Sequence, residues 1–217
     1  MIARGPILEF KGEHRRLSSF YDGEDAGFQL TPPALYGSPL GGWLRGEVIT
    51  RRWCRCREVG FQALKCARRE DAEWVLESKD AAQAKRRGSA KGEDGRRVEM
   101  IDGWDAKGGV GGLAQVAMLH CARLQFGPDG EMREYLRSTG YRPLVEGNTW
   151  GDMTWGAVWA SQEGVEALTD GGHTGRRWGS REAERPAGQV TELLFGENWL
   201  GRVLMRVRAE VDCEVLL

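Results

Sequence analysis

Three polar residues, Glu58, Gln62 and Lys65, are the side chains of this sequence best suited to do chemistry together. They lie within residues 54–69, and a helical turn of about 100° per residue places them in one narrow stripe. The rest of the circumference is mainly apolar, whereas a surface helix has a broad polar face. The pattern therefore predicts a mostly buried central helix that aims an acid, an amide and an amine in one direction.

Buried polar groups need partners, because an unsatisfied group costs on the order of 1–3 kcal/mol and an isolated charge costs far more. Two arrangements meet this requirement. In the first, Glu58 and Lys65 form an internal ion pair that Gln62 bridges. In the second, the stripe lines a pocket and meets a ligand. Helical geometry alone leaves both arrangements open.

Short elements must hold this helix in place. Residues 7–10 and 143–146 have the pattern of short strands, and residues 22–50 are rich in Gly and Pro, which favours hairpins or loops. Helical spacing and helix-end residues predict four more helices. They cover residues 70–87, 113–126 and 130–138, and a last stretch that begins at Asn198 as N-cap. Gly88 is expected to end the first of them in the left-handed conformation.

The chain is predicted to be a single compact α+β domain over residues 1–217, mainly helical with short strands. Two segments, 89–103 and 160–195, are predicted to be insertions. Within the second, residues 160–188 are polar and glycine-rich, which is typical of an inserted loop rather than of a second domain. A glycine-rich run at 107–112 precedes a helix; such a run can present backbone N–H groups to phosphate, although a hinge is its commoner role.

Composition limits the classes of function. The 217 residues carry a formal net charge of −1, which argues against general adhesion to nucleic acid or to acidic membranes. A nucleic-acid contact would need a local basic patch, and residues 85–97 form the best one, although such a run is usually a solvated helix end and loop.

Targeting and cofactor signals are lacking in the sequence. It has no apolar run of about 20 residues and no signal-peptide pattern, so we expect a cytoplasmic protein without a membrane segment. Five cysteines, an odd number, fit reduced thiols better than disulfides. Cys54, Cys56, Cys66 and His120 lack a recognised zinc spacing. Nothing in the sequence requires a metal or an organic cofactor.

Several motifs, in order from residue 7 to about residue 208, resemble the NADAR superfamily. Its Leu-Ser-Asn-Phe-Tyr element is similar to residues 17–21, and its central helix has Glu, Gln and Lys at the spacing found here. An Ala-Lys-x-x-Gly element matches residues 84–88, and the Trp that follows it matches Trp104. Ser19 departs from the family's Asn, and Gln125 departs from a Lys usual at that position.

The C-terminal half continues the resemblance. The family's Asp-x-x-Trp-Gly element matches Asp152, Trp155 and Gly156, and the entry to its closing helix matches Gly196-x-Asn198. Members of the superfamily include N-glycosidases of riboflavin intermediates and hydrolases that remove ADP-ribose from guanine. The resemblance therefore implies cleavage of a bond between ribose C1′ and a nitrogen.

The resemblance also suggests roles for individual residues. Such a bond suits a pair of acids, for which Glu58 and Asp152 are the candidates. Lys65 has two possible uses, as an ammonium that holds a phosphate or as an amine that forms a Schiff base. Trp104 and Trp155 are candidates for stacking on the base, although most of the nine tryptophans must belong to the core. The full set of expected substrate-binding residues is Ser18, Ser19, Phe20, Gln62, Trp104, Trp155, Gly156 and Asn198.

We expect an N-glycosidase, and its favoured substrate is ADP-ribosylated guanine in DNA or RNA, with phosphates gripped by residues 85–97. One alternative is an enzyme that hydrolyses phosphoribosylamino-pyrimidine intermediates of riboflavin synthesis. A second is a module that binds ADP-ribose or a nucleotide without cleaving it, and a third is a scaffold or inhibitor protein that keeps the fold. The sequence leaves the oligomeric state open.

Overall fold

The computed structural model describes residues 5–31, 52–104, 112–185 and 188–213. It has an α+β fold, as predicted. Contacts group the chain into two units, one of residues 1–15 with 139–206 and the other of residues 16–138 with 207–217. We call them the sheet unit and the helical unit. The prediction of one domain over residues 1–217 stays a prediction.

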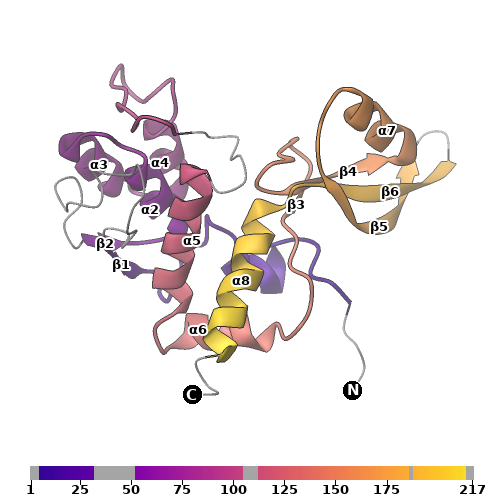
Figure 1. Ribbon diagram of the computed structural model, residues 1–217, viewed down its shortest axis with the longest axis horizontal. Helices are drawn as coiled ribbons and strands as arrows, with labels where there is room; N and C mark the ends of the chain where they lie inside the picture. Colours follow the sequence, from indigo (N-terminus) through magenta and orange to yellow (C-terminus); the bar gives the residue numbers. More distant parts are fainter. Residues whose placement is uncertain (1–4, 32–51, 105–111, 186–187, 214–217) are drawn as a thin grey trace. The chain divides into compact units, whose positions relative to one another are not determined.

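The helical unit is built around α2 (Arg57–Leu64), whose eight residues are all buried. Three helices pack on it: α3 (Arg69–Leu76), α4 (Ala81–Arg87) and α5 (Leu113–Phe126) (Figure 1). A small antiparallel sheet joins β1 (Phe28–Leu30) to β2 (Arg52–Cys54), and α6 (Glu131–Ser138) packs against α5. The predicted central helix is therefore present and buried, but shorter than residues 54–69.

The observed helices differ from the predicted ones at both ends of the central helix and within the helix predicted at 70–87. Cys54 belongs to β2, and Cys66 pairs with Met100 in an isolated β-bridge, so neither lies in α2. The predicted helix over 70–87 is two helices. The reason is local, because the Asp80 side chain accepts a hydrogen bond from the Gln83 amide and so begins a new helix as its N-cap.

Gly88 does not adopt the predicted left-handed conformation. Its φ of −78° is open to any residue, so its backbone does not require glycine. Lack of space favours glycine at this position instead. A Cβ atom at position 88 would overlap the side-chain oxygen of Gln62 and lie 2.9 Å from Cε of Lys65. Glycine lets the end of α4 approach the polar stripe of α2.

The sheet unit contains four strands in the order β3-β4-β6-β5. They are β3 (Gly147–Asn148), β4 (Ala157–Ser161), β5 (Arg176–Arg185) and β6 (Gly188–Gly196), and only the β3/β4 pair is parallel. Helix α7 (Gln162–Asp170) packs on β4 and β6 (Figure 1). Val145, Ala157 and Leu194 form a buried cluster in this unit. The predicted strand at 7–10 contributes one parallel bridge, between Ile7 and Leu144.

The prediction of a loop over residues 160–188 was wrong, because this segment contains the end of β4, α7, β5 and the start of β6, and the β5–β6 hairpin continues to Gly196. Its polarity has a structural reason: polar side chains pair across the two strands. The Thr191 hydroxyl donates to Glu182, and the Arg181 guanidinium donates to Glu192 at 3.1 Å. Such pairs stabilise a sheet but hide the alternating apolar pattern by which a strand is recognised.

The last helix, α8 (Trp199–Cys213), supplies residues to both units. A short 3₁₀ helix, η1 (Gly12–Leu17), precedes the Ser18–Phe20 segment. Among the described residues, no helix has the length and apolar character needed to cross a bilayer. The glycine-rich run at 107–112 and most of the predicted hairpin segment at 22–50 lie outside the described residues, apart from Gly112 and residues 22–31.

Candidate active site

Glu58 is the most buried acid among the described residues of the helical unit. Its side chain is buried, and both carboxylate oxygens accept hydrogen bonds. Gln62 Nε2 donates to Oε1 at 2.8 Å, and Ser19 Oγ donates to Oε2 at 3.1 Å. The Glu58 amide also donates to the Ser19 carbonyl at 2.9 Å. The segment after η1 thus holds the start of α2 by a backbone and a side-chain contact together.

Burial dominates the protonation of Glu58. It raises the pKa of this carboxyl, whereas the Gln62 hydrogen bond, the Lys85 charge, the Ser19 hydrogen bond and the Lys65 charge oppose it in that order. Donors stabilise a carboxylate and burial stabilises an acid. Burial outweighs these donors, so the pKa of Glu58 is raised, a shift that is common for carboxyl groups that exchange a proton in a reaction.

Lys65 follows the last residue of α2 and is 7 % exposed. Burial lowers the pKa of its amine, the charge of Glu58 raises it, and the charge of Lys85 lowers it further. Within the described part of the chain Lys65 forms no ion pair, so the internal bridge from Glu58 to Lys65 is not made there. The stripe instead holds one acid–amide pair and a separate buried amine.

Gln62 lies between Glu58 and Lys65 along the stripe and bonds to Glu58 alone among the described residues. Its Nε2 atom is used by Glu58, but its buried Oε1 atom has no hydrogen-bond partner among the described residues. That oxygen faces Gly88, where a side chain would collide with it. A buried carbonyl without a donor is costly, and this oxygen can still accept a hydrogen bond that no described residue supplies.

Lys85 is a residue of this site that the predicted list omitted. It lies in the last turn of α4, and its charge acts on both Glu58 and Lys65. Its ammonium is 5.3 Å from the centroid of the Phe20 ring. The Ala84–Gly88 motif was the available signal, since residues three apart on a helix face the same way and Gly88 contacts the stripe.

The other candidates of the helical unit lie around the stripe. Ser18 Oγ accepts from the Phe20 amide at 3.2 Å, which shapes the turn, and Phe20 is 39 % exposed. Trp104 contacts Phe61 with ring centroids 5.4 Å apart. The Lys65 carbonyl accepts from the Ile101 amide, which ties the segment before Trp104 to the end of α2. The helical unit therefore brings Ser19, Gln62 and Glu58 into direct contact.

Asp152, Trp155 and Gly156 belong to the sheet unit. Asp152 Oδ1 accepts from the amides of Thr154 at 3.0 Å and Trp155 at 2.9 Å, which closes a tight turn. Gly156 is required for space, because a Cβ there would overlap the Glu146 carbonyl. One oxygen of Asp152 thus shapes its own loop, and no described residue bonds to Oδ2.

Asn198 is fully buried in the same unit and adopts a positive φ of 53°. Its Nδ2 donates to the Leu144 carbonyl at 2.9 Å, and its Oδ1 accepts from the Glu146 amide at 3.0 Å. The amides of residues 197–200 donate to carbonyls of residues 153–156. The N–H groups that could have met a phosphate at the start of α8 are therefore already bonded.

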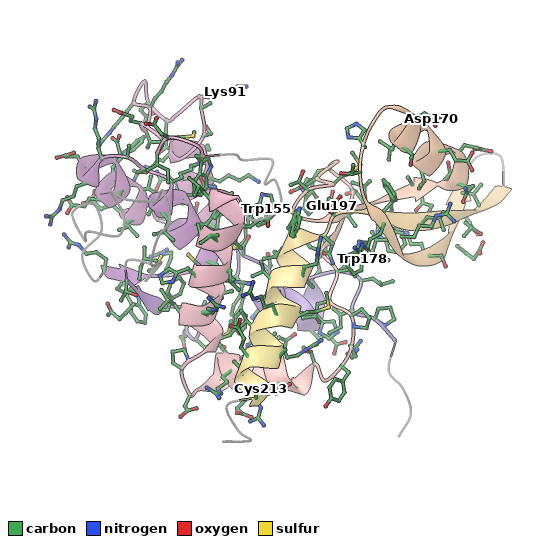
Figure 2. All side chains as sticks on the ribbon, viewed as in Figure 1. Lys91, Trp155, Asp170, Trp178, Glu197 and Cys213 are labelled. Carbon is green, nitrogen blue, oxygen red and sulfur yellow. The ribbon has the colours of Figure 1, made fainter. Side chains whose placement is uncertain are left out.

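Three of the four arginines of the 85–97 region, Arg86, Arg87 and Arg96, have internal acid partners. Glu93 accepts from Arg86 at 3.1 Å and from Arg87 at 2.8 Å, and Asp71 accepts from Arg96 at 3.1 Å. Arg87 and Arg96 also lie over the Trp74 ring. This part of the region is a folded polar cluster, whereas Lys91 lies exposed in the loop after α4 (Figure 2).

The cysteines around α2 are structural. Cys54, Cys56, Cys66 and Cys121 are buried thiols. Burial raises the pKa of Cys56 to about 11 and that of Cys66 to about 12, so both stay protonated and unreactive near neutral pH. Among the described residues, no three His, Cys, Asp or Glu side chains gather in a way that could hold a metal ion.

The fold is an α+β arrangement in which a short buried helix carries an acid, an amide and an amine. No family model and no curated protein sequence matches the chain. Among solved structures, the NMR structure of the E. coli protein YbiA is similar, with a TM-score of 0.58 and 17 % sequence identity. The match covers 99 % of this chain and 90 % of that one. At this identity the likeness shows the fold.

Proposed function

We propose that this chain is an N-glycosidase that hydrolyses the bond between ribose C1′ and a nitrogen of a nucleobase-like amine. One observation carries the proposal: Glu58 and Lys65 are both buried on one stripe without being paired to each other among the described residues. Burial without neutralisation is costly. A substrate that supplies the missing partners would account for it.

Glu58 is suited to the proton transfers of this reaction. Bond cleavage leaves positive charge on the ribose and negative charge on the departing nitrogen, so the nitrogen needs a proton and C1′ needs water. A buried acid with a raised pKa can give the proton, and the resulting carboxylate is stabilised by Gln62 and Ser19. The carboxylate can then take a proton from the attacking water. Asp152 is the second acid of the proposal, through its Oδ2.

Lys65 is suited to a covalent route. The lowered pKa of its buried amine favours the neutral form, which is the nucleophilic one. Attack on C1′ displaces the base, which leaves as a neutral amine after it gains one proton. The ribose ring then opens by breaking the C1′–O4′ bond, O4′ takes the second amine proton, and a C=N bond to Nζ forms. Water then adds to the C=N carbon, restores the lysine amine and leaves the sugar aldehyde. In the direct route, Lys65 instead remains an ammonium beside a phosphate.

The sequence motifs support the class of the reaction. Residues 17–21, 58–65 and 84–88 resemble the NADAR superfamily, and the resemblance implies an N-glycosidase. We therefore propose ADP-ribosylated guanine as the first substrate to test. Trp104 and Trp155 are proposed to contact the base, and residues 18–20, Gln62, Gly156 and Asn198 to bind or shape the site.

A second candidate substrate is a phosphoribosylamino-pyrimidine of riboflavin synthesis. The internal pairing of Arg86, Arg87 and Arg96 favours it, because those guanidinium groups are already bonded to acids. A small substrate needs no extended basic surface, whereas a polynucleotide does. Salt dependence of turnover separates the two, since only the polynucleotide reaction should weaken strongly with added salt.

The test is a mass-spectrometric assay of the purified protein without added metal. The substrates are an ADP-ribosylated guanine oligonucleotide and the phosphoribosylamino-pyrimidines, and the variants are Glu58→Gln and Lys65→Ala. Release of ADP-ribose or of ribose 5-phosphate, lost in both variants and kept in the exposed control Glu77→Gln, supports the proposal and names the substrate. Tight binding of ADP-ribose without turnover of either substrate would replace it with the binding module.

The covalent route has its own test. Borohydride added during turnover should reduce the C=N bond and leave a stable adduct on Lys65, located by peptide mass mapping. The same treatment of Lys65→Ala should give no adduct at position 65. An active enzyme that yields no adduct would exclude the Schiff base and favour direct attack by water.

A further inference from the structure

The last turn of α4 presents a face toward the polar stripe. Gly88 lies so close to α2 that a methyl group there would meet Gln62 and Lys65. Lys85 precedes Gly88 by three residues, and residues three apart on a helix share a face. Lys85 is therefore on the side of α4 that faces the stripe, which agrees with its charge acting on Glu58 and Lys65.

The Lys85 ammonium has a defined position. It lies 5.3 Å from the centroid of the Phe20 ring, within the range of a cation–π contact. Phe20 is the residue after Ser19, which bonds Glu58, and it is one of the few large apolar side chains left exposed. The ring thus holds the ammonium beside the residues that contact the buried acid.

Lys85 differs from its neighbours in having no acid of its own. Arg86 and Arg87 both donate to Glu93, whereas among the described residues no carboxylate forms an ion pair with Lys85. Its side chain is exposed, so an incoming ligand can reach it. An exposed cation next to a buried reactive group is a place where a substrate anion can bind.

We propose that Lys85 and Phe20 form the phosphate-binding edge of the site, where the Lys85 ammonium contacts a phosphate of the ribosyl substrate. The inference rests on the proposed function for the identity of the ligand. Gly88 serves it by letting α4 approach α2. Lys85 then acts as a specificity residue that favours phosphorylated ribose over ribose itself.

Lys85 also tunes the reactive pair. The groups that act on Lys65 are Glu58, Cys66 and Lys85, and those that act on Glu58 are Gln62, Ser19, Lys65 and Lys85. Removing the Lys85 charge should raise the pKa of both Glu58 and Lys65, because a nearby cation stabilises the carboxylate and destabilises the ammonium. The pH–rate profile of Lys85→Gln should therefore move to higher pH.

Binding of ribose 5-phosphate tests the edge without turnover. Titration calorimetry of the full chain should show Lys85→Gln binding about tenfold more weakly than the unsubstituted protein, a change of about 1.4 kcal/mol. Lys85→Arg should restore most of the affinity. The matched control Lys91→Gln removes the same charge from the exposed loop after α4. It should leave the affinity within about twofold, since salt screens an exposed charge that does not contact the ligand.

Ribose without phosphate completes the test. Its weak binding should be the same in Lys85→Gln and in the unsubstituted protein. Equal affinity of Lys85→Gln and Lys91→Gln for ribose 5-phosphate would overturn the edge, and so would failure of the unsubstituted protein to bind it. Turnover with an unaltered Lys85→Gln profile would keep the glycosidase and reject the edge. Lys85-dependent binding without any turnover would keep the edge and reject the glycosidase.

Discussion

The Glu58 stripe of the helical unit and the Asp152 loop of the sheet unit are both acidic motifs, yet their acids have different partners. Glu58 accepts from two side chains, Gln62 and Ser19, in a buried setting that raises the pKa of its carboxyl. Asp152 accepts from two backbone amides of its own turn. Glu58 is held by side chains, whereas Asp152 is held by the backbone of its own turn.

The difference separates chemistry from architecture. A carboxylate oxygen that closes a turn gives that turn its conformation, so its loss is expected to be felt as stability. A buried carboxylate that side chains support can change its protonation while the backbone stays in place. The candidate roles of the two acids can therefore be separated by substitutions that keep the shape of each carboxyl group and remove its charge.

The largest effect is expected from Glu58→Gln. The amide keeps the size of the side chain but can neither give nor take the proton, so kcat should fall by about 10²- to 10⁴-fold, the usual contribution of a general acid or base. Circular dichroism should show an intact fold. If the variant retains turnover, Glu58 is not the general acid or base, and the proposed difference between Glu58 and Asp152 is wrong.

Lys65→Met should stabilise the protein near neutral pH. Burial lowers the pKa of Lys65 in the folded state. Above pH 10.5, the ordinary pKa, the amine is neutral in both the folded and the unfolded state, and its burial costs no ionisation free energy. As the pH falls from 10.5 to the lowered folded pKa, the free energy of unfolding decreases, and it stays low at neutral pH. Each unit of lowering is worth about 1.4 kcal/mol of unfolding free energy. Methionine has no such dependence.

Urea denaturation at a series of pH values measures this difference. The advantage of Lys65→Met over the unsubstituted protein should be greatest at neutral pH and should shrink as the pH rises toward 10.5. A variant less stable than the unsubstituted protein at pH 7 would instead mean that the ammonium is paired, as in the internal ion-pair arrangement. That outcome would make the stripe structural, like the Asp152 loop.

Gly88→Ala should disturb the stripe without unfolding α4. The φ of −78° accepts alanine, but the new methyl group must push aside Gln62 and Lys65. A displacement of about 1 Å at a reacting group can cost about 10²-fold in rate. Steady-state kinetics measure it, and Gly5→Ala is the control because a Cβ there meets nothing within 4 Å. In a double-mutant cycle, the effect should shrink when Gln62 is already alanine.

Local pattern predicted the bounds of two helices closely. Helix α5 covers 113–126 and α6 lies within 130–138, because apolar spacing and end residues are features of a short stretch of sequence. The same helical period correctly placed Glu58 and Gln62 on one face, where they bond. Four residues of separation along a helix determine that contact.

The rest of the site depends on contacts between distant residues. Ser19 meets Glu58 across 39 positions, and Gly88 and Lys85 reach the stripe through the packing of α4 on α2. From the sequence, Gly88 is recognisable only as the end of a helix, and we predicted a left-handed cap there. Its close approach to Gln62 and Lys65 depends on how α4 packs on α2. The β5–β6 hairpin was missed for a related reason, since its paired polar residues look like a loop.

The smallest effect on stability is expected from Asp152→Asn. Asparagine keeps Oδ1, so the two amides of Thr154 and Trp155 retain their acceptor, and stability should change by no more than about 0.5 kcal/mol. Asp152→Ala removes that acceptor and should cost about 0.5–2 kcal/mol, the range found when a capping side chain is lost. Urea denaturation of Asp152→Asn and Asp152→Ala measures how much the side chain contributes to stability through its turn.

The activity of Asp152→Asn then decides how far the comparison extends. If Asp152 serves only its turn, the variant keeps kcat close to that of the unsubstituted protein while Glu58→Gln does not. If Oδ2 is the second acid of the reaction, kcat falls as steeply as in Glu58→Gln with stability unchanged. Because the amide keeps the turn, such a loss would be chemical rather than structural.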